Sequence, residues 1–357
     1  MTETSAGRHP ERADHSWWVY RGTGVPPRAG SEPPSIPPPP PWRVFGGSDP
    51  HPIPEEDATA VARRLGATTT SDSKRSAGET DLVNAALFLR RPLLVTGPTG
   101  VGKSSLAYLV AHELGLGPVL HWGVTSRTTL KSGLYDYDAI GRAQAIAAWR
   151  SAELRGDAAG TEENAAPLIG DFIRLGPLGT ALLPYARPRV LLIDELDKSD
   201  IDLPNDLLHV FEDGGFAVPE IARSGQETVN VFTSDPGVRA RVKSGRVECL
   251  EFPFVIVTSN GERDFPSAFL RRCLRLEMQH PTSRQLAGLV AGHLSTAQAR
   301  GNAGLIQDFL DRIGQRQVLA VDQLLNAVHM TTSGGYRPDG EGRELLNHLL
   351  ADLAEGS

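Results

Sequence analysis

Cysteine is nearly missing from this sequence, and long apolar runs are missing altogether. Cys249 and Cys273 are too few to form a disulfide framework or a cysteine-rich metal site. No apolar run reaches the roughly 18 residues that a membrane-spanning helix needs, and the N-terminus lacks an apolar signal region. The ten histidines are scattered without ligand spacing. We therefore expect a cytoplasmic protein without a membrane segment.

The sequence also has no excess of positive charge. Its 36 Lys and Arg against 43 Asp and Glu give a net charge of −7, so no global basic field attracts nucleic acid. One local basic stretch remains, formed by Arg239, Arg241, Lys243 and Arg246. With 357 residues, the chain is long enough for two domains with cores of their own.

Proline is concentrated near the N-terminus. Twelve of the 27 prolines lie between Pro26 and Pro54, which predicts that residues 1–54 are extended or disordered. Aromatic side chains flank these prolines, which is unusual for an inert tail: Trp17, Trp18, Tyr20, Trp42 and Phe45. We hypothesise that the aromatics dock on the body of the chain, on a neighbouring copy or on a partner. The alternative is a mobile linker with incidental aromatics.

A glycine-rich loop follows an apolar strand at residues 92–96. The loop consists of Gly97, Pro98, Thr99, Gly100, Val101, Gly102, Lys103 and Ser104. Its glycines let successive N–H groups point at phosphate oxygens, and residues 105–114 predict a helix whose positive end faces the anion. Lys103 can bind the β- and γ-phosphates, and the Ser104 hydroxyl can ligate Mg²⁺. This order favours nucleotide binding over a chance glycine turn.

A second apolar strand, at residues 190–193, ends in two acids. Asp194 can hold Mg²⁺, and Glu195 can polarise a water for attack on the γ-phosphorus. An apolar strand that ends in two acids is common by itself. After a phosphate-binding loop, however, it predicts that the chain hydrolyses its nucleotide.

A third apolar strand, at residues 254–258, is followed by Asn260. The Asn260 amide is placed to orient the attacking water between the two motifs. The alternative is an asparagine that closes a turn before Gly261.

Two adjacent arginines end a predicted short helix further along the chain. Asp264 reads as the cap of this helix and Pro266 as an early helical residue, so Arg271 and Arg272 fall at its end. An arginine here can stabilise phosphoryl transfer, most simply on the nucleotide of a neighbouring subunit. The alternative is ordinary surface charge.

The order of apolar runs predicts the architecture. Strands near 92–96, 119–124, 189–193, 254–258 and 274–278 alternate with helical stretches, which indicates a parallel sheet with helices on both faces. Residues 216–250 read as a β-rich insertion. Beyond residue 281, apolar residues at helical spacing predict a small helical domain, with core stripes such as Leu286, Leu289, Val290, His293 and Leu294.

Taken in order, these motifs resemble the AAA+ ATPases, and their MoxR branch in particular. Residues 174–178, 205–214 and 265–272 also look like segments of that branch, and the similarity covers about residues 80–355. The resemblance implies an α/β fold of the P-loop type: a three-layer αβα domain at residues 55–280 with strand order 5-1-4-3-2. It also implies a small helical lid domain at residues 281–357.

The resemblance further implies ATP and Mg²⁺ as cofactors and gives the motif residues their roles. Lys103 and Ser104 would bind phosphate and metal, Asp194 the metal, Glu195 would activate water, Asn260 would sense the γ-phosphate, and Arg272 would act as a finger in trans. Cys273 stands where the family commonly has an aromatic, so Arg271 and Arg272 are not separated. The family also commonly has an arginine at the start of a late lid helix. Residues 319–325 contain none, and Arg316 is the candidate replacement.

As a function, the resemblance implies an ATP-hydrolysing ring, expected to be a homo-hexamer, that remodels or activates a protein partner. The usual partners of the family contain a von Willebrand factor A domain. A motor acting on nucleic acid is one alternative, kept open by the basic stretch that contains Arg239. A nucleotide-dependent scaffold without hydrolysis is another, and Glu195 argues against it.

Overall fold

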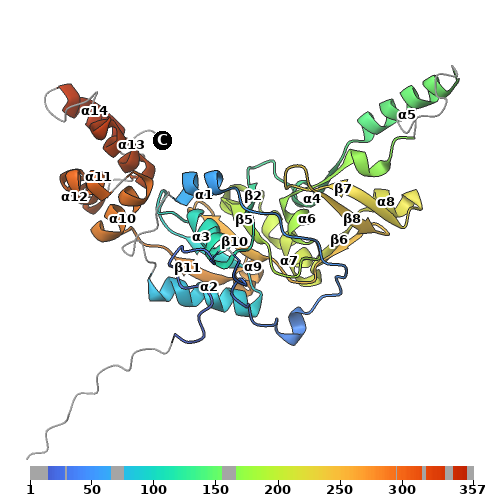
Figure 1. The fold of residues 1–357 in the computed structure, drawn as a ribbon, viewed down its shortest axis with the longest axis horizontal. Coiled ribbons are helices and arrows are strands. Elements are labelled where there is room, and N and C mark those ends of the chain that lie inside the picture. The colour runs from blue at the N-terminus through green and yellow to red at the C-terminus, as the bar shows by residue number, and fades with distance from the viewer. Residues whose placement is uncertain are drawn as a thin grey trace, which may run out of the picture.

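A computed structural model describes residues 15–28, 30–65, 76–154, 166–294, 296–315, 319–333 and 341–351. It contains two β-sheets, and a separate group of C-terminal helices lies at the far end from the second sheet (Figure 1). The strands are β1 (Leu93–Thr96), β2 (Leu120–Gly123), β3 (Tyr135–Tyr137), β4 (Ile173–Leu175), β5 (Val190–Asp194), β6 (Gly215–Ala217), β7 (Thr228–Phe232), β8 (Arg239–Lys243), β9 (Arg246–Glu248), β10 (Phe254–Ser259) and β11 (Leu274–Glu277). The helices are η1 (Pro41–Arg43), α1 (Ala58–Leu65), α2 (Ala77–Leu89), α3 (Ser105–Leu114), α4 (Leu130–Leu134), α5 (Ala139–Leu154), η4 (Ile169–Phe172), α6 (Pro177–Ala181), η5 (Leu196–Lys198), α7 (Leu203–Asp213), α8 (Pro219–Ser224), α9 (Ser267–Arg272), α10 (Ser283–His293), α11 (Thr296–Gly301), α12 (Ala303–Gly314), α13 (Val321–Thr332) and α14 (Glu341–Leu349).

The first sheet is parallel throughout and has the order β11-β1-β10-β5-β2. Counted along the chain within this sheet, the order is 5-1-4-3-2. Each of its strands coincides with a predicted apolar run. Strand β10 lies between β1 and β5 and is buried along its whole length. The carboxyl-terminal ends of β1, β5 and β10 therefore lie side by side at one edge of the sheet.

Helices cover both faces of this sheet. Apolar residues of α2 and α3 pack on one face, against side chains such as Leu93, Val190 and Ile256. Residues of α6, α7 and α9 pack on the other face, against side chains such as Leu94 and Leu191. The first sheet is thus the middle of three layers, as expected for strands that are apolar on both faces.

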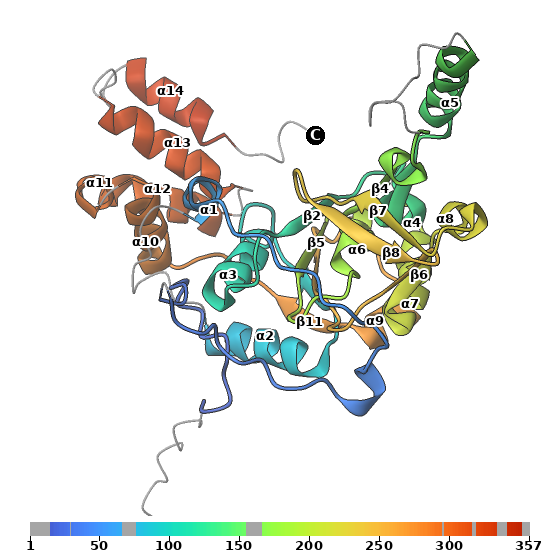
Figure 2. The ribbon, with the colours of Figure 1, turned by 45° about the vertical axis from the view of Figure 1, so that its right-hand side comes forward.

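The second sheet has the order β3-β4-β7-β8-β9-β6 and packs into the same core as α6 and α7. Residues 216–250 supply β7, β8, β9 and most of β6. The sheet also takes in β3 and β4, which come from outside that range and were not expected as strands. Helix α5 follows β3, has no buried residue and projects away from the body (Figures 1 and 2).

Residues 15–54, which we call the strap, are mostly extended and pack on the body of the protein. Near its start, the Trp18 indole donates a hydrogen bond to Asp81 (2.8 Å), and Tyr20 is completely buried. The Asn84 side chain accepts from the N–H groups of Val19 (2.8 Å) and Tyr20 (3.0 Å) and donates to the Tyr20 carbonyl (2.7 Å). This part of the strap therefore belongs to the core and is not a free linker. Residues 1–14 lie outside the described part of the chain.

The later part of the strap runs over the body to the second sheet (Figure 2). Arginines of the body hold the carbonyls of its prolines: Arg187 donates to Pro34 (3.0 Å) and Arg90 to Pro37 (2.8 Å). Proline has no N–H, but its carbonyl still accepts, so an extended proline-rich segment is well held by such donors. Phe45 then packs beside Phe252, with ring centroids 5.8 Å apart.

The C-terminal helices have a core of their own. Its buried residues come from α10, α12, α13 and neighbouring segments: Leu286, Val290, Ile306, Phe309, Leu319, Leu324, Ala327, Val328 and Leu350. The apolar stripes of the sequence thus form a small helical core, apart from the exception described below. Within the described part of the chain, no helix is long and apolar enough to cross a bilayer.

Replacing Asn84 by alanine tests the docking of the strap. The change leaves the partly buried N–H group of Val19 and the buried N–H group of Tyr20 without their acceptor, so we expect the free energy of unfolding to fall by about 1–3 kcal/mol. Urea unfolding measures this loss. Asn230→Ala, on the exposed face of β7, is the matched control and should leave stability nearly unchanged. Equal effects of the two changes would contradict the described docking.

Candidate functional site

The glycine-rich loop lies between β1 and α3, as the sequence predicts. Gly97 has φ 142° and Gly100 has φ 76°, a region that favours glycine. A Cβ atom on Gly97 would lie 2.4 Å from the Met278 carbonyl oxygen, and one on Gly100 would lie 2.4 Å from Ala320. Glycine is therefore required at both positions, and the backbone of the loop forms a tight concave turn.

The Lys103 ammonium lies inside this loop. It donates to the carbonyls of Gly97 and Pro98, both at 2.8 Å. Burial lowers the pKa of Lys103, and the neighbouring carboxylates of Asp197, Asp194 and Glu195 only partly oppose that shift. The positive charge of Lys103 is thus poorly solvated, which favours an anion beside it.

Asp194 is the centre of the acidic side of the site. Its Oδ1 accepts from the Ser104 hydroxyl (2.7 Å) and from the Thr258 hydroxyl (2.6 Å), while its Oδ2 lies 3.2 Å from His121 Nε2. Burial raises the pKa of Asp194, but the hydrogen bonds from His121, Thr258 and Ser104 outweigh it and lower the pKa to about 2. Asp194 is therefore a carboxylate at neutral pH. Thr258 and His121 were not singled out from the sequence.

Glu195 lies next to this carboxylate in an unusual backbone conformation. Its φ of 61° and ψ of 47° are left-handed, which costs a non-glycine residue about 1–2 kcal/mol. The Thr258 hydroxyl accepts from its N–H group (2.9 Å) and so fixes this turn. Its carboxylate is 2.8 Å from the Lys198 ammonium and 3.4 Å from the Asn260 amide nitrogen. The structure thus brings Asn260 to Glu195, as the hypothesis of a water-orienting pair requires.

A further acid, Asp197, holds the tip of strand β10. Its Oδ2 accepts from the backbone N–H groups of Asn260 (2.9 Å) and Glu262 (3.0 Å), and the residue is almost completely buried. Among the described residues, its Oδ1 has no hydrogen-bond partner. Asp197 therefore fixes the backbone of Asn260. No sequence pattern predicts this contact, because it depends on β10 and β5 being neighbours in the sheet.

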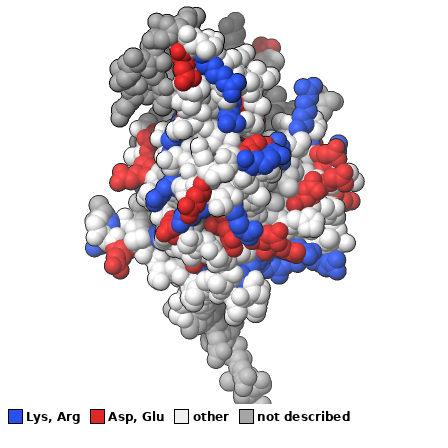
Figure 3. Space-filling view, turned by 90° about the vertical axis from the view of Figure 1, so that its right-hand side faces the viewer, with Lys and Arg blue, Asp and Glu red and all other residues white. Residues whose placement is uncertain are grey.

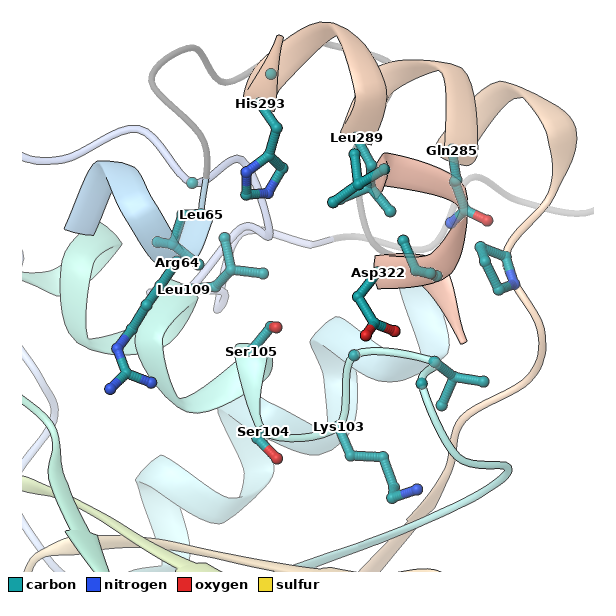
Figure 4. A pocket seen from close by; sticks show the side chains of 18 of the residues that line it. Arg64, Leu65, Lys103, Ser104, Ser105, Leu109, Gln285, Leu289, His293 and Asp322 are labelled. Carbon is teal, nitrogen blue, oxygen red and sulfur yellow. The ribbon is translucent and has the colours of Figure 1, made fainter. Parts of the chain in front are cut away.

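A cavity of about 440 Å³ opens above the loop (Figure 4). Residues of the loop, both strand-end acids and Asn260 form its floor and wall. Across from them, α10 points Gln285, Leu289 and His293 into the cavity. The expectation that His293 is a core residue is therefore wrong, because it lies on the side of α10 that faces the cavity. Leu289 lines the cavity and also packs against the helical core, as expected.

The start of α13 also reaches the cavity. Ala320 packs on Gly100, and Asp322 points toward the loop that carries Lys103 (Figure 4). An acid thus stands near the place where the resemblance leads one to expect an arginine. Arg316, the suggested replacement, lies outside the described residues.

The strap forms another wall of the same cavity. Gly22, Thr23 and Gly24 line it, and the buried carboxylate of Glu113 holds them in place. Glu113 accepts from the N–H groups of Arg21, Thr23 (2.6 Å) and Gly24 (2.8 Å). The sequence did not reveal this role, because in isolation Glu113 is only one acid on a helix.

The paired arginines, Arg271 and Arg272, lie outside the cavity of their own chain. Helix α9 has Pro266 at its N-cap, so the expectation that Asp264 caps it is wrong by two residues. Arg272 forms an ion pair with Glu212 of α7, and the Arg271 carbonyl accepts a hydrogen bond from Arg91. Neither Arg271 nor Arg272 is among the residues that line the cavity. The structure therefore does not bring them to the site of the same chain.

The residues at the cavity fit a magnesium-bound nucleotide. The loop leaves no room for side chains at Gly97 and Gly100, and Lys103 provides a poorly solvated positive charge. The oxygens of Ser104 and Asp194 lie 2.7 Å apart. Oxygen ligands of this kind suit Mg²⁺, which binds through one or two protein groups together with phosphate oxygens.

Comparisons with known proteins add little to this geometry. No family model matches the chain, and no curated protein matches it. Among solved structures, the crystal structure of NtrX from Brucella abortus matches with a TM-score of 0.40 and 16% sequence identity. The match covers 82% of this chain and 56% of that chain, so this chain spans little more than half of NtrX. A similarity of this extent says nothing about function.

Asp194 makes the free energy of unfolding depend on pH in the acid range. Because its pKa falls from 3.8 to about 2 on folding, its contribution is present above pH 4 and is lost as the pH falls toward 2. The full contribution is about 2 kcal/mol. We expect Asp194→Asn to lower the unfolding free energy at pH 7 and to cost much less near pH 2, measured by urea unfolding at both pH values. Asp200→Asn, at an exposed position, should show no such difference.

Proposed function

We propose that the chain is an ATPase of the AAA+ superfamily, of the MoxR type, that uses ATP and Mg²⁺ to remodel or activate a protein partner. The observation that carries this proposal is the meeting of Ser104, Asp194, Glu195 and Asn260 at one cavity. These residues come from three different strand ends, and their order along the chain resembles that branch. The parallel order of the first sheet supports the same proposal.

Binding rests on the loop and on its neighbours. The N–H groups of the loop and the Lys103 ammonium bind the phosphates, for which Lys103 leaves the carbonyls of Gly97 and Pro98. Ser104 and Asp194 hold the metal ion, which when bound neutralises charge on the β- and γ-phosphates. The apolar side chains of Leu65, Leu109 and Leu289 line the other end of the cavity, where they suit a flat base.

Hydrolysis rests on Glu195 and Asn260. Glu195 accepts the proton of the attacking water, and the Asn260 amide orients that water toward the γ-phosphorus. In the described conformation Lys198 pairs with the Glu195 carboxylate, so Glu195 becomes a free base only when Lys198 turns away. Asp197 keeps Asn260 in position through its backbone.

The C-terminal helices act as a lid in this proposal. Residues of α10 and α13 line the cavity together with the loop, so a bound nucleotide contacts both parts. A change in the nucleotide then changes the position of the helices, which turns hydrolysis into movement. The acid Asp322 faces the phosphate end of the cavity, where it opposes closure over an unneutralised triphosphate.

The ring belongs to the proposal as well. Arg272 does not reach the cavity of its own chain, so we infer that it acts on the nucleotide of a neighbour in a homo-oligomer, expected to be a hexamer. A partner with a von Willebrand factor A domain is the candidate that the resemblance suggests.

Nucleic acid is a weaker candidate for the substrate. In the basic stretch at β8 and β9, Arg239 pairs with Asp171 (2.6 Å), Lys243 with Asp49, and Arg246 with Glu248 (2.9 Å). The end of the molecule that carries the second sheet shows positive and negative side chains mixed together (Figure 3). Three of the four basic side chains in this stretch are therefore already paired, and paired charges attract a phosphate backbone less strongly.

Two substitutions at the cavity test the proposed activity. Lys103→Ala should abolish tight ATP binding, because the loop loses its only lysine. Glu195→Gln should keep ATP binding but lose turnover, since only the proton acceptor is removed. Isothermal calorimetry measures binding and phosphate release measures turnover, with Glu262→Gln, at an exposed position, as the control. Full turnover by the Glu195→Gln variant would contradict the role of this residue.

Arg272→Ala and Arg271→Ala test the finger. Loss of an arginine that acts in trans costs on the order of 10³ in rate. We expect Arg272→Ala to keep ATP binding and to lose turnover by about this factor, while Arg271→Ala keeps most of its activity. The opposite result would assign the role to Arg271. Mixing Arg272→Ala with Lys103→Ala should restore some turnover, because each variant supplies what the other lacks.

A further inference from the structure

One part of the strap does not pack on the body. Of the five aromatic residues that flank the prolines, Tyr20 is buried and Trp18 is hydrogen-bonded to Asp81. Trp17 contacts Phe88 edge to face, and Phe45 packs at a tilt beside Phe252. Trp42, in the η1 turn, is 78% exposed, and the nearby Val44 is 66% exposed. A tryptophan side chain that is exposed in this way leaves a large apolar surface in contact with water, which is unfavourable.

The turn itself is firmly attached to the protein. Arg43, which follows Trp42, donates to the Phe211 carbonyl (2.6 Å), and its guanidinium lies 5.1 Å from the centroid of the Phe252 ring. Trp42 is therefore presented by a fixed segment and not by a loose tail. An anchor that is ordered in advance loses little entropy when it binds.

Arginines surround this turn. Arg43 lies beside the last turn of α7, where Glu212 pairs with Arg272, and Arg91 donates to the carbonyls of Arg271 and Arg272 at the end of α9. The charges of Glu212, Arg91 and Arg272 all act on Arg43, so these groups lie close together. We call Trp42, Val44, Arg43, Arg91 and Arg272 the arginine–tryptophan face. Glu212 pairs with Arg272, so the three arginines outnumber this neighbouring acid and the face keeps a net positive charge.

The nucleotide cavity offers the opposite charge. Asp194, Glu195 and Asp322 line it, and a bound triphosphate adds further negative charge. None of the residues of the arginine–tryptophan face lines the cavity of its own chain. The two surfaces can thus meet only between different copies, head to tail. Contacts of this kind form a ring when the rotation between copies closes, and an open filament otherwise.

We propose that the η1 turn of the strap is a subunit contact, in which Trp42 packs beside the nucleotide cavity of a second copy of the chain. This inference rests on the proposed function, because the bound nucleotide supplies part of the charge that the arginines meet. The inference adds the η1 turn to the contact between neighbouring subunits that we proposed for Arg272. The same strap lines its own cavity with Gly22, Thr23 and Gly24, so one segment touches the nucleotide sites of two copies.

Self-association of the purified full chain tests the proposal. Sedimentation velocity with ATP and Mg²⁺ compares the Glu195→Gln chain, which retains its nucleotide, with the same chain carrying Trp42→Ala. We expect Trp42→Ala to weaken association by about 10-fold or more, as is typical for a tryptophan at the centre of an interface. Ile140→Ala, at an exposed apolar position of α5 and away from the cavity, is the control and should have no effect. The urea midpoint of Trp42→Ala should match that of the parent, because the side chain is exposed.

Photo-crosslinking identifies the surface that Trp42 meets. A chain with p-benzoylphenylalanine at position 42 should give a crosslinked dimer with ATP, and the crosslinked peptide should come from the cavity side of the second copy. Association that Trp42→Ala leaves unchanged would overturn the inference, as would a crosslink to the same η1 turn of the second copy or a chain that stays monomeric with ATP bound. A chain that binds no ATP at all would instead overturn the proposed function.

Discussion

The hydrogen bond from Ser104 to Asp194 is the contact on which the site depends. It joins residues that are 90 positions apart, and Thr258 from a third segment donates to the same carboxylate oxygen. The three side chains meet because β10 lies between β1 and β5. If β10 were at an edge of the sheet, Asn260 would lie away from Glu195. The order of the strands is therefore as much a part of the site as the residues themselves.

Much of this fold can be predicted from the sequence, because its strands are apolar on both faces and end at recognisable motifs. The second sheet was harder to predict. Strands β3 and β4 have three residues each, with polar Asp136 and Arg174 in the middle, and so short a segment shows no period. Residues 1–54 were predicted to be extended or disordered, and the sequence did not decide between the two. The contacts that order the strap, with Asn84 and Glu113, depend on residues far away in the sequence.

The residues of the site likewise divide into those that the sequence predicts and those that it does not. Lys103, Asp194 and Asn260 belong to local motifs, and the structure brings them together as expected. Thr258 and Asp197 act through neighbours in space, so no spacing in the sequence reveals them. Helix α10 shows a different limit of prediction. Its apolar stripe is wide enough to face both the helical core and the cavity, and periodicity alone does not separate the two sides.

The strap also affects the order in which the protein folds. It is the first described part of the chain to be made, yet the residues that hold it extend from Asp81 to Phe252. During synthesis it must wait until most of the body exists, and then close around it as one of the last events. Contacts between residues so far apart also slow folding. A newly made chain therefore exposes its proline-rich segment, and the surface on which that segment packs, until late in folding, and both are open to a chaperone during that time.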